Sequence, residues 1–231
     1  MGYEKKIICL ANSRKKSGRC IAGREVLEND FGPWIRPVSI RPTKEISEKE
    51  RRYENGRRAV VFDIIKIPLL DPVPVHHHVE DHLIDADLYW SKKGMANWGT
   101  IEGLLDPLNS PLWINGDSTY HGMNDKISET LASGLQSSLM LIRPSDLKIL
   151  VRKESGFAGS PERRCVRAEF NAAEAHYRLK VTDPIAEEKY LSCNDGTYPL
   201  DGAILCVSLG EAWKQYVFKL VAAILTPDMI T

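Results

Sequence analysis

Short apolar runs separated by turn residues dominate the pattern of the chain. Residues 5–11 form a β-rich apolar run, which predicts a buried strand. Residues 19–27 alternate between apolar and polar positions, and residues 34–39 follow the chain-breaking pair Gly32-Pro33. The first forty residues therefore predict three short strands. Similar strand patterns recur at residues 59–70, 138–142, 146–154, 163–170, 176–182 and 203–209.

These strand patterns restrict the fold class. Short strands with turn residues about every 8 to 12 positions are typical of small barrels or a sandwich. A doubly wound α/β fold would require strands and helices to alternate regularly, and this chain has no such alternation. The sequence therefore predicts an all-β fold with minor helical insertions.

A few segments favour helices instead. Residues 43–54 are rich in charged helix formers and carry Ser47 and Glu50 at capping-box spacing, which predicts a polar surface helix. Further short helices are expected near residues 99–105 and 125–135. The last apolar run, residues 216–225, fits a strand or a buried helix, because an apolar run of ten does not decide between them.

The composition excludes several classes of protein. With 43% hydrophobic and 27% charged residues, the chain does not have the composition of a disordered protein. No stretch approaches the roughly 18 apolar residues that span a bilayer, and the first 19 residues do not resemble a signal peptide. The five cysteines form no C-x-x-C pair, which is typical of reduced thiols. We therefore expect a globular, cytoplasmic protein with no membrane partner.

The charges are unevenly distributed although the formal net charge is zero. Residues 1–60 carry 15 Lys and Arg against 8 Asp and Glu, whereas residues 71–130 carry 3 against 10. Because fields are screened within about 10 Å at ordinary salt, a locally positive segment can attract a phosphate backbone even on a neutral protein. The alternative for such a basic cluster is an ordinary solvated face. If the chain binds nucleic acid, we expect the contact to begin within the basic segment.

Motifs along nearly the whole chain resemble one prokaryotic family, the dual OB-fold-containing domain family. They are residues 7–24 (IICLANSRKKSGRCIAGR), 32–39 (GPWIRPVS), 112–116 (LWING), 122–125 (GMND), 138–142 (SLMLI), 181–184 (VTDP), 208–211 (SLGE) and 219–223 (KLVAA). The resemblance implies two consecutive OB-like β-barrels, a proposed role in nucleic-acid binding, and an association with anti-phage or other conflict systems. We expect the first barrel, with an acidic loop-rich insertion, at residues 1–110 and the second at residues 111–231.

An OB barrel indicates where a ligand would bind. It exposes one curved sheet face and two loops, on which bases stack against aromatic rings while Lys and Arg contact the phosphates. The loop between the first two strands carries candidate phosphate and hydrogen-bonding groups. These residues are Asn12, Ser13, Arg14, Lys15, Lys16 and Arg19. The alternative is an ordinary β-turn with solvated lysines.

Further candidates lie on strands and in other loops. Trp34 and Arg36 are two positions apart on a strand and so project from the same face, which suits a stacking ring beside a guanidinium group. Alternatively, Trp34 is part of the core and Arg36 reaches outward. Trp113 begins an aromatic and glycine-rich loop that could serve recognition or seal an interface between the barrels. The remaining candidates are Asp183, Ser208 and Glu211.

Metal and catalytic sites are not expected. His76, His77 and His78 precede Glu80 and Asp81, but adjacent residues of an extended segment point to opposite sides. A mobile histidine-rich loop is therefore the preferred interpretation, with no metal and no cofactor. No P-loop, nucleophile-elbow, zinc-protease or deaminase motif occurs, so no catalytic residue is identified.

The expected function is non-catalytic binding of single-stranded or structured DNA or RNA, as an accessory or sensor protein. The defence role, with protein partners of a defence system, follows from the resemblance alone. Three alternatives stay open: a small-ligand sensor for a nucleotide or modified base in a pocket between the barrels, a metal-dependent nuclease or nucleotide-modifying enzyme, and a protein–protein adaptor.

Overall fold

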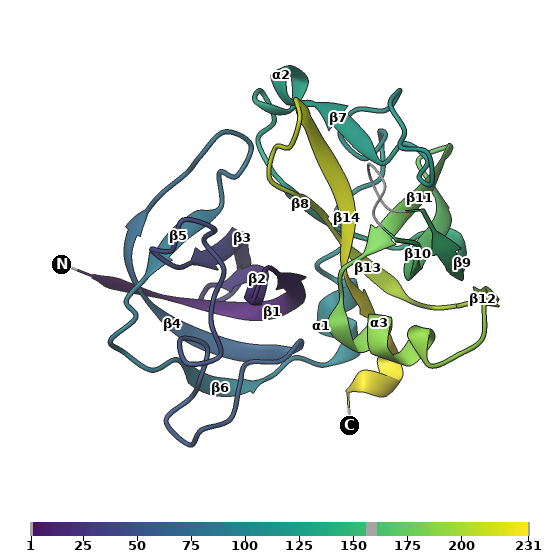
Figure 1. Cartoon of the computed structure of the whole chain (residues 1–231). Helices are drawn as coiled ribbons and strands as arrows, with labels where there is room; N and C mark the ends of the chain where they lie inside the picture. Colours follow the sequence, from purple (N-terminus) through teal and green to yellow (C-terminus); the bar gives the residue numbers. More distant parts are fainter. Residues whose placement is uncertain (1, 156–160, 231) are drawn as a thin grey trace. The chain divides into compact units, whose positions relative to one another are not determined.

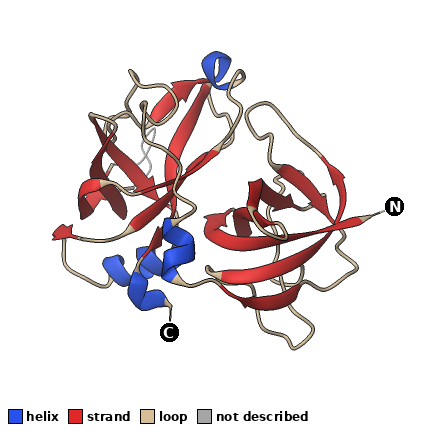
Figure 2. Ribbon diagram, turned by 180° about the vertical axis from the view of Figure 1, so that it is seen from behind, coloured by secondary structure: helices blue, strands red, loops and turns tan. Residues whose placement is uncertain are grey.

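The chain divides into two structural units, which Figure 1 draws. The structure is a computed structural model, and it describes residues 2–155 and 161–230. The first unit comprises residues 1–105, 136–138 and 228–231, and the second comprises residues 106–135 and 139–227. Strands dominate both units and the helices are short, as Figure 2 shows.

Six strands form the sheet of the first unit. They are β1 (Tyr3–Lys15), β2 (Gly18–Val26), β3 (Phe31–Val38), β4 (Asp63–Pro72), β5 (Asp81–Ile84) and β6 (Ser91–Met95). The strand β1 pairs with both β2 and β4, so the neighbours run β1-β2-β3-β5-β4 and return to β1. The pairing of β3 with β5 is parallel. Because β5 has only four residues, the ring of strands has few backbone pairings where β5 joins β3 to β4. The helix α1 (Trp98–Glu102) follows the sheet.

The core of the first unit lies on one side of these strands. Ile35 on β3 and Ile21 on β2 are buried in a cluster with residues of the other strands, including Ile65 and Ile84. Side chains alternate across a strand, so the neighbours of Ile35 project to the opposite, outer side. This alternation places Trp34 and Arg36 together on the outer side, as the sequence predicts.

The second unit contains eight strands and two helices. They are β7 (Lys126–Ser128), α2 (Glu129–Ala132), β8 (Leu139–Ile142), β9 (Ser145–Glu154), β10 (Arg163–Ala172), β11 (Ala175–Val181), α3 (Pro184–Leu191), β12 (Gly196–Pro199), β13 (Ile204–Leu209) and β14 (Tyr216–Leu225). A short 3-10 turn, Pro227–Met229, follows.

The strand pairings of the second unit repeat those of the first. Pro144 lies between β8 and β9 and has no N–H to donate, so what would be one long strand is divided into two. The strand β9 pairs with β10, and β8 pairs with β13. Between them, β10 pairs with β11, β11 runs parallel to β14, and β14 pairs with β13. The strands β8 and β9 together therefore take the place that β1 has in the first unit.

The predicted all-β fold with two OB-like units is confirmed by this strand content and topology. A five-strand circuit with Greek-key connections is the arrangement of an OB fold. The run at residues 216–225, which the sequence left open, is strand β14 and pairs with β13 over most of its length. Helix α1 overlaps the expected range 99–105 but begins one residue earlier, helix α2 falls within the expected range 125–135, and both are shorter than those ranges.

The helix predicted at residues 43–54 is wrong. The capping-box bonds do form, with the Ser47 N–H donating to Glu50 Oε2 at 2.7 Å and the Glu50 N–H donating to Ser47 Oγ at 3.3 Å. No helix follows them in this described segment, which consists of turns and isolated bridges. Ile46 pairs with Arg19 of β2 through two backbone hydrogen bonds of 2.9 Å. This pairing with a distant strand overrides the local helix signal.

Candidate nucleic-acid interface

Alternation along the strands gives the second unit a polar outer face. Val166 and Ala168 of β10 and Leu179 of β11 are buried in the core of the unit. Their neighbours Arg167 and Lys180 therefore project outward. Together with residues of β14, they form what we call the β10/β11/β14 face. Its outer side chains are Arg163, Cys165, Arg167, Lys180, Phe218 and Leu220.

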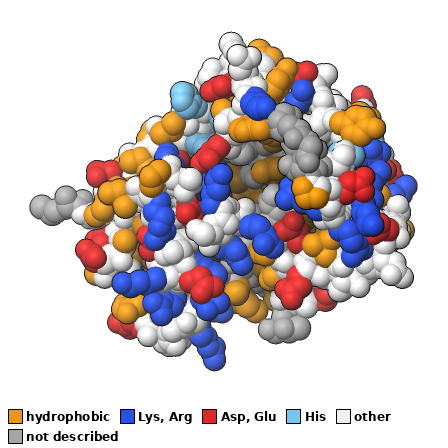
Figure 3. All heavy atoms as spheres, in the orientation of Figure 1, with side chains coloured by type: hydrophobic (Ala, Val, Ile, Leu, Met, Phe, Trp, Pro, Cys, Tyr) orange, Lys and Arg blue, Asp and Glu red, His pale blue; other side chains and the backbone are white. Residues whose placement is uncertain are grey.

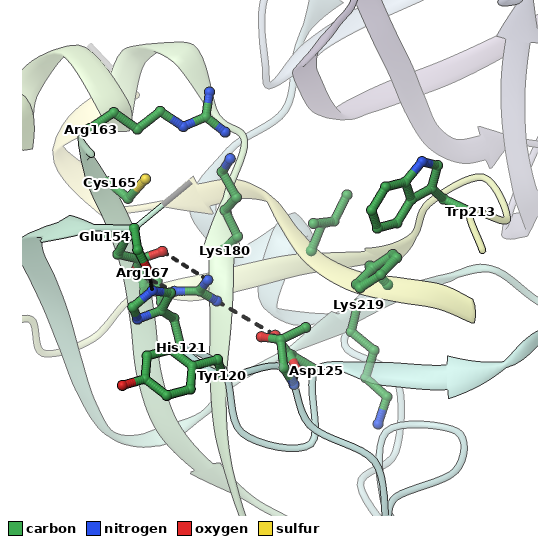
Figure 4. A pocket seen from close by; sticks show the side chains of 14 residues that line it. Tyr120, His121, Asp125, Glu154, Arg163, Cys165, Arg167, Lys180, Trp213 and Lys219 are labelled. Atoms are coloured by element: carbon green, nitrogen blue, oxygen red, sulfur yellow. Dashed lines mark hydrogen bonds and ion pairs between the residues drawn. The ribbon is translucent and has the colours of Figure 1, made fainter. Parts of the chain in front are cut away.

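A cavity of about 540 Å³ lies on this face, and Figure 4 shows it at close range. Its walls come from three more segments: the loop at residues 119–125, the end of β9, and the hairpin that connects β13 to β14. In an OB fold the face of strands 2 and 3 and the loops 1–2 and 4–5 bind ligands. The second unit's strands β10 and β11 and its β13–β14 hairpin correspond to those positions in the circuit.

An arginine between two carboxylates forms one wall of the cavity. Arg167 is only 7% exposed and donates from Nε to Glu154 Oε1 at 2.6 Å and from Nη2 to Glu154 Oε2 at 3.0 Å. Its Nη1 lies 3.6 Å from Asp125 Oδ2. Figure 4 shows Arg167 between the two acids. Such paired hydrogen bonds fix the guanidinium plane, and the two charges of opposite sign allow it to be buried.

Two further cations, Arg163 and Lys180, line the cavity. Arg163 is exposed and Lys180 is half-buried, and neither makes a side-chain hydrogen bond or ion pair with any other residue that the structure describes. Figure 4 shows the charged ends of both side chains on the same side of the Arg167 pair. Both ammonium and guanidinium groups are thus available to an anionic ligand.

Aromatic rings stand beside these cations. Trp213 is 49% exposed and Tyr120 is 93% exposed. Trp213 and Tyr216 exchange two backbone hydrogen bonds of 2.8 and 3.1 Å across a two-residue turn. Lys214 and Gln215 both have positive φ, at 50° and 67°, as a type I′ hairpin turn requires. The turn fixes the backbone that presents Trp213 at the edge of the cavity.

The loop at residues 119–125 is folded around the carboxylate of Asp125. Thr119 donates to this carboxylate from its N–H at 2.7 Å and from its hydroxyl at 2.6 Å. A Cβ atom at Gly122 would lie 1.7 Å from Asp125 Oδ2, so only glycine fits there. Asn124 has a φ of 49° and donates from Nδ2 to the His176 carbonyl at 2.9 Å. The motif at residues 122–125 therefore builds this wall of the cavity.

Lys219 binds the loop that contains Ile114 and Asn115. Its side chain is buried, and Nζ donates to the Ile114 carbonyl and to Asn115 Oδ1, both at 2.8 Å. Asn115 Nδ2 in turn donates to the Tyr177 hydroxyl at 2.9 Å. Burial lowers the pKa of Lys219 to about 7, and the nearby charge of Asp125 opposes this shift. A neutral amine still has the two N–H donors that these contacts use.

The dual OB-containing domain model matches residues 5–224. The chain belongs to the dual OB-containing domain family. No curated protein matches the chain. Among solved structures, the chain is similar to the one titled "Crystal structure of the tetrameric p202 HIN2", with 12% identity over 97% of this chain and 94% of that chain. The TM-score of 0.32 supports no conclusion about function.

Several motifs that carry the family resemblance meet at the cavity of this dual OB-containing domain protein. The motif at residues 112–116 is tied to Lys219, which begins the motif at residues 219–223. The backbone N–H of Lys219 donates to the Asp125 carbonyl at 2.9 Å, which joins the motif at residues 122–125 to the same place. Segments far apart in the sequence therefore build one site in the second unit.

The basic loop predicted in the first unit is the tight turn between β1 and β2. Lys16 has a φ of 49° and, like Arg14, is exposed. Asn12 and Ser13 are engaged in the fold, because Asn12 Nδ2 donates to the Ala59 carbonyl at 3.0 Å and Ser13 Oγ donates to the Cys20 carbonyl at 3.5 Å. The other predicted cations of this turn are Lys15 and Arg19, both half-buried.

The lysine and arginine side chains of the first unit do not form a purely basic patch in the view of Figure 3. Blue and red side chains lie among one another on the left of this view. Arg24 donates to the Gly32 carbonyl at 2.9 Å, and its guanidinium lies 5.9 Å from the ring centre of Trp34. Other cations of residues 1–60 pair with acids, as Lys5 does with Glu25 and Arg41 with Glu50.

Trp34 and Arg36 share the outer side of β3, and both are buried. Arg36 is 4% exposed and donates from Nε to Asp81 Oδ1 at 2.6 Å and from Nη1 to Ser138 Oγ at 3.2 Å. Lys44 Nζ reaches the other oxygen of Asp81 at 3.1 Å. The arginine is therefore part of a buried ion-pair network rather than reaching outward.

The other predicted residues lie in different environments. Trp113 has a φ of 57° and packs, half-buried, against the core of the second unit. Asp183 caps α3 by accepting from the N–H groups of Ile185 and Ala186 and also accepts from the Ile224 N–H at 3.0 Å. Ser208 lies on β13, whereas Glu211 is exposed in the same connection that carries Trp213.

The sequence interpretation missed the residues of the cavity itself. Arg163 and Arg167 lie an even number of positions apart on one strand, and this spacing was the available signal that they share a face. Tyr120 lies in the loop that begins at Trp113, for which recognition was one of the two interpretations of the sequence. Lys180 and Trp213 gave no such signal, because only the strand pairings bring them to the same place. The cavity therefore depends on long-range topology.

The histidine segment is not the mobile loop expected. His77 and His78 are buried, and their rings pack edge to face with centres 4.2 Å apart. Within residues 2–155 and 161–230, no group of three or more His, Cys, Asp or Glu side chains is placed to hold a metal ion. No helix in the described part of the chain is both long and apolar enough to cross a membrane.

Proposed function

We propose that this protein binds single-stranded nucleic acid through the β10/β11/β14 face of its second unit. One observation carries the proposal: Arg163 and Lys180, without partners among the described residues, lie at the same cavity as the exposed rings of Trp213 and Tyr120. Single-stranded nucleic acid presents both a negative backbone and stacking bases, and OB folds bind it with cations and aromatic rings.

Each group has a distinct task in this proposal. Arg163 and Lys180 contact phosphates, which supplies affinity that falls with salt. Trp213 and Tyr120 stack on bases, each stacked base contributing about 1–3 kcal/mol. The turn that carries Arg14 and Lys16 in the first unit stays a separate proposed phosphate contact, supported by the exposure of these two residues.

The test is the affinity of the purified protein for a labelled 12-residue oligothymidine, an RNA of the same length and a DNA duplex, at two salt concentrations. Replacing Arg163 and Lys180 together by alanine should weaken binding to the single strands about 10-fold and lower the salt slope by roughly 0.7 per lost phosphate contact. The matched control replaces Lys148 and Lys189, exposed cations of the same unit outside the cavity. Equal losses in both double variants would contradict the proposal.

A second candidate function is the sensing of a free nucleotide or modified base. The volume of the cavity supports it, because about 540 Å³ lies within the range of small-molecule sites, roughly 300–1,000 Å³. Calorimetry with the mononucleotides separates the two functions. Binding of a mononucleotide with no binding of any oligonucleotide would favour the sensor.

We further propose that the protein is a non-catalytic accessory or sensor of a prokaryotic defence system, a role that rests on the family resemblance alone. Phage plating on host cells that carry the wild-type gene or the Arg163/Lys180 double variant tests it. Reduced plating with the wild type only is the expected result. Equal plating on both strains and on cells without the gene would contradict the role.

A further inference from the structure

We infer that the cavity of the second unit accepts a guanine base, whose edge is read by Arg167 and Glu154. The inference rests on the proposed function, because it names the chemical group that the same site would take from a nucleic acid. It is carried by the hydrogen-bonding groups at the wall of the cavity rather than by the cations at its rim.

One nitrogen of the Arg167 guanidinium group, Nη1, is available to a ligand in the cavity. Arg167 is more than nine-tenths buried, and both Nε and Nη2 donate to Glu154. Its Nη1 approaches Asp125 only to 3.6 Å and makes no hydrogen bond within the described part of the chain. Because Arg167 lines the cavity, Nη1 can donate to a ligand there. An acceptor of a ligand at this point would gain a charge-assisted hydrogen bond from the guanidinium group.

Two carboxylates, those of Glu154 and Asp125, provide hydrogen-bond acceptors beside this donor. Glu154 and Asp125 also line the cavity, so one guanidinium group faces two carboxylates. An ionised carboxylate accepts about four hydrogen bonds, and Glu154 uses two of these positions for Arg167. The wall therefore offers one free donor next to an excess of acceptors. A ligand edge with one acceptor and several donors matches it.

The four bases differ in the hydrogen-bond donors and acceptors on their pairing edges. Guanine presents the acceptor O6 beside two donor groups, N1–H and N2–H, on its pairing edge, and O6 is also the atom that arginine contacts in DNA recognition. Adenine, cytosine and thymine each present fewer donors on that edge. Guanine therefore satisfies the free Nη1 and uses the acceptor capacity of Glu154 at the same time.

The remaining walls suit the rest of a nucleotide. Phe218 and Trp213 line the cavity with their ring centres 6.2 Å apart, which gives an apolar surface for a base plane. Arg163 and Lys180 lie at the same cavity for the attached phosphate. A guanine at this site could come from a single strand or from a free guanine nucleotide, and the experiment distinguishes these sources.

The experiment measures the affinity for oligothymidine and for the same strand with one central thymidine replaced by guanine, adenine, cytosine or an abasic unit. GMP and AMP are titrated in parallel. We expect the guanine strand to bind about 10-fold more tightly than the other strands, the order of discrimination that a bidentate base contact gives. Tighter binding of GMP than of AMP, with no oligonucleotide binding, would support the guanine site but overturn the proposed function.

Two variants connect this preference to the wall. Glu154→Gln keeps the size of the side chain but replaces an acceptor by a donor, so it should abolish the guanine preference, measured as the ratio of the affinities for the guanine strand and for oligothymidine. The matched control is Glu169→Gln, because Glu169 pairs with Arg178 on β10 and β11 but does not line the cavity. The control should keep the preference, and thermal unfolding shows whether both variants are folded.

The outcomes separate the two proposals. Equal affinity for all five strands, with binding to oligothymidine intact, would overturn the guanine site and leave the proposed function standing. A guanine preference that persists in folded Glu154→Gln would also overturn the assignment of the reading residues. Absence of binding to every strand and to both mononucleotides would overturn both proposals.

Discussion

The outer faces of β2/β3/β5 and of β10/β11/β14 are equivalent in the two strand circuits, yet they differ in what covers them. Both contain a buried arginine paired with a carboxylate, Arg36 with Asp81 and Arg167 with Glu154. In the first unit, Lys44 contacts Asp81 and Ser138 contacts Arg36 Nη1, and Asp81 is fully buried. In the second unit, the corresponding pair borders a cavity that Arg163 and Lys180 also line.

The difference shows that one topology can give a structural face or a binding face. The deciding feature is whether segments outside the strands supply partners for the polar groups. In the first unit, Lys44 and Ser138 supply partners for Asp81 and for Arg36 Nη1, while Arg36 Nη2 keeps no hydrogen-bond partner among the described residues. In the second unit, the loop at residues 119–125 supplies Asp125 but leaves Arg163 and Lys180 without partners among the described residues.

The largest effect is expected for Arg36→Met in the first unit. The change leaves Asp81 buried with Lys44 as its remaining ionic partner, and breaking a buried pair from one side costs about 3–5 kcal/mol. Denaturant unfolding should show this loss in the free energy of unfolding. Oligothymidine affinity of the folded fraction should stay at the wild-type value. A large loss of affinity at unchanged stability would mean that the first unit's face binds the ligand.

Replacing the tryptophan of each face should have opposite consequences: the change in the second unit should affect binding, and the change in the first unit should affect stability. Trp213→Ala should weaken oligothymidine binding by about 1–3 kcal/mol, the contribution of one stacked base, with little change in stability. Trp34→Ala should instead lower the free energy of unfolding by about 3–5 kcal/mol, because this ring is buried. Fluorescence titration and thermal unfolding of both variants measure the two effects. If Trp34→Ala weakened binding without loss of stability, the roles of the faces would be reversed.

The basic turn of the first unit gives a smaller expected effect. Replacing Arg14, Lys15, Lys16 and Arg19 together by alanine should weaken single-strand binding and flatten its salt dependence. The loss should be smaller than in the Arg163/Lys180 double variant, because the four cations of this turn do not line the cavity of the second unit. Titration at two salt concentrations measures both quantities. An unchanged affinity and salt slope would remove the turn from the binding surface.

The last prediction concerns Lys219 and the pH dependence of stability. Its lowered pKa, about 7, means that the folded state releases this proton at a lower pH than the unfolded state does. The stability of the wild type should therefore rise relative to Lys219→Met as the pH increases from about 7 towards 10, and fall again as the pH returns to 7. Urea unfolding at several pH values measures this difference. A difference that is constant over this range would show that Lys219 stays charged in the folded protein.

Part of this structure could be predicted from the sequence, for identifiable reasons. The strands follow from local alternation, as at Ile35 between Trp34 and Arg36, and the family motifs indicated the dual OB architecture. The segment at residues 43–54 misled the interpretation because its capping box is a local signal, whereas its conformation is decided by the pairing of Ile46 with Arg19. Local patterns do not contain such distant partners.

The binding face was harder to predict than the fold. Its residues come from segments between Thr119 and Leu220, and the parallel pairing of β11 with β14 brings two of these segments together. The count of charges indicated the first unit, but counting does not show which cations are already paired. Arg36 is buried in an ion pair and Lys180 has no such partner among the described residues, although both are basic residues on a strand.

The most direct test of the account is hydrogen–deuterium exchange of the whole protein with and without oligothymidine. Peptides that cover residues 163–167, 178–180 and 213–220 should exchange more slowly with the oligonucleotide, whereas those that cover residues 34–38 should not change. Protection confined to the first unit, with no change in these three segments, would contradict the claim that the second unit carries the binding face.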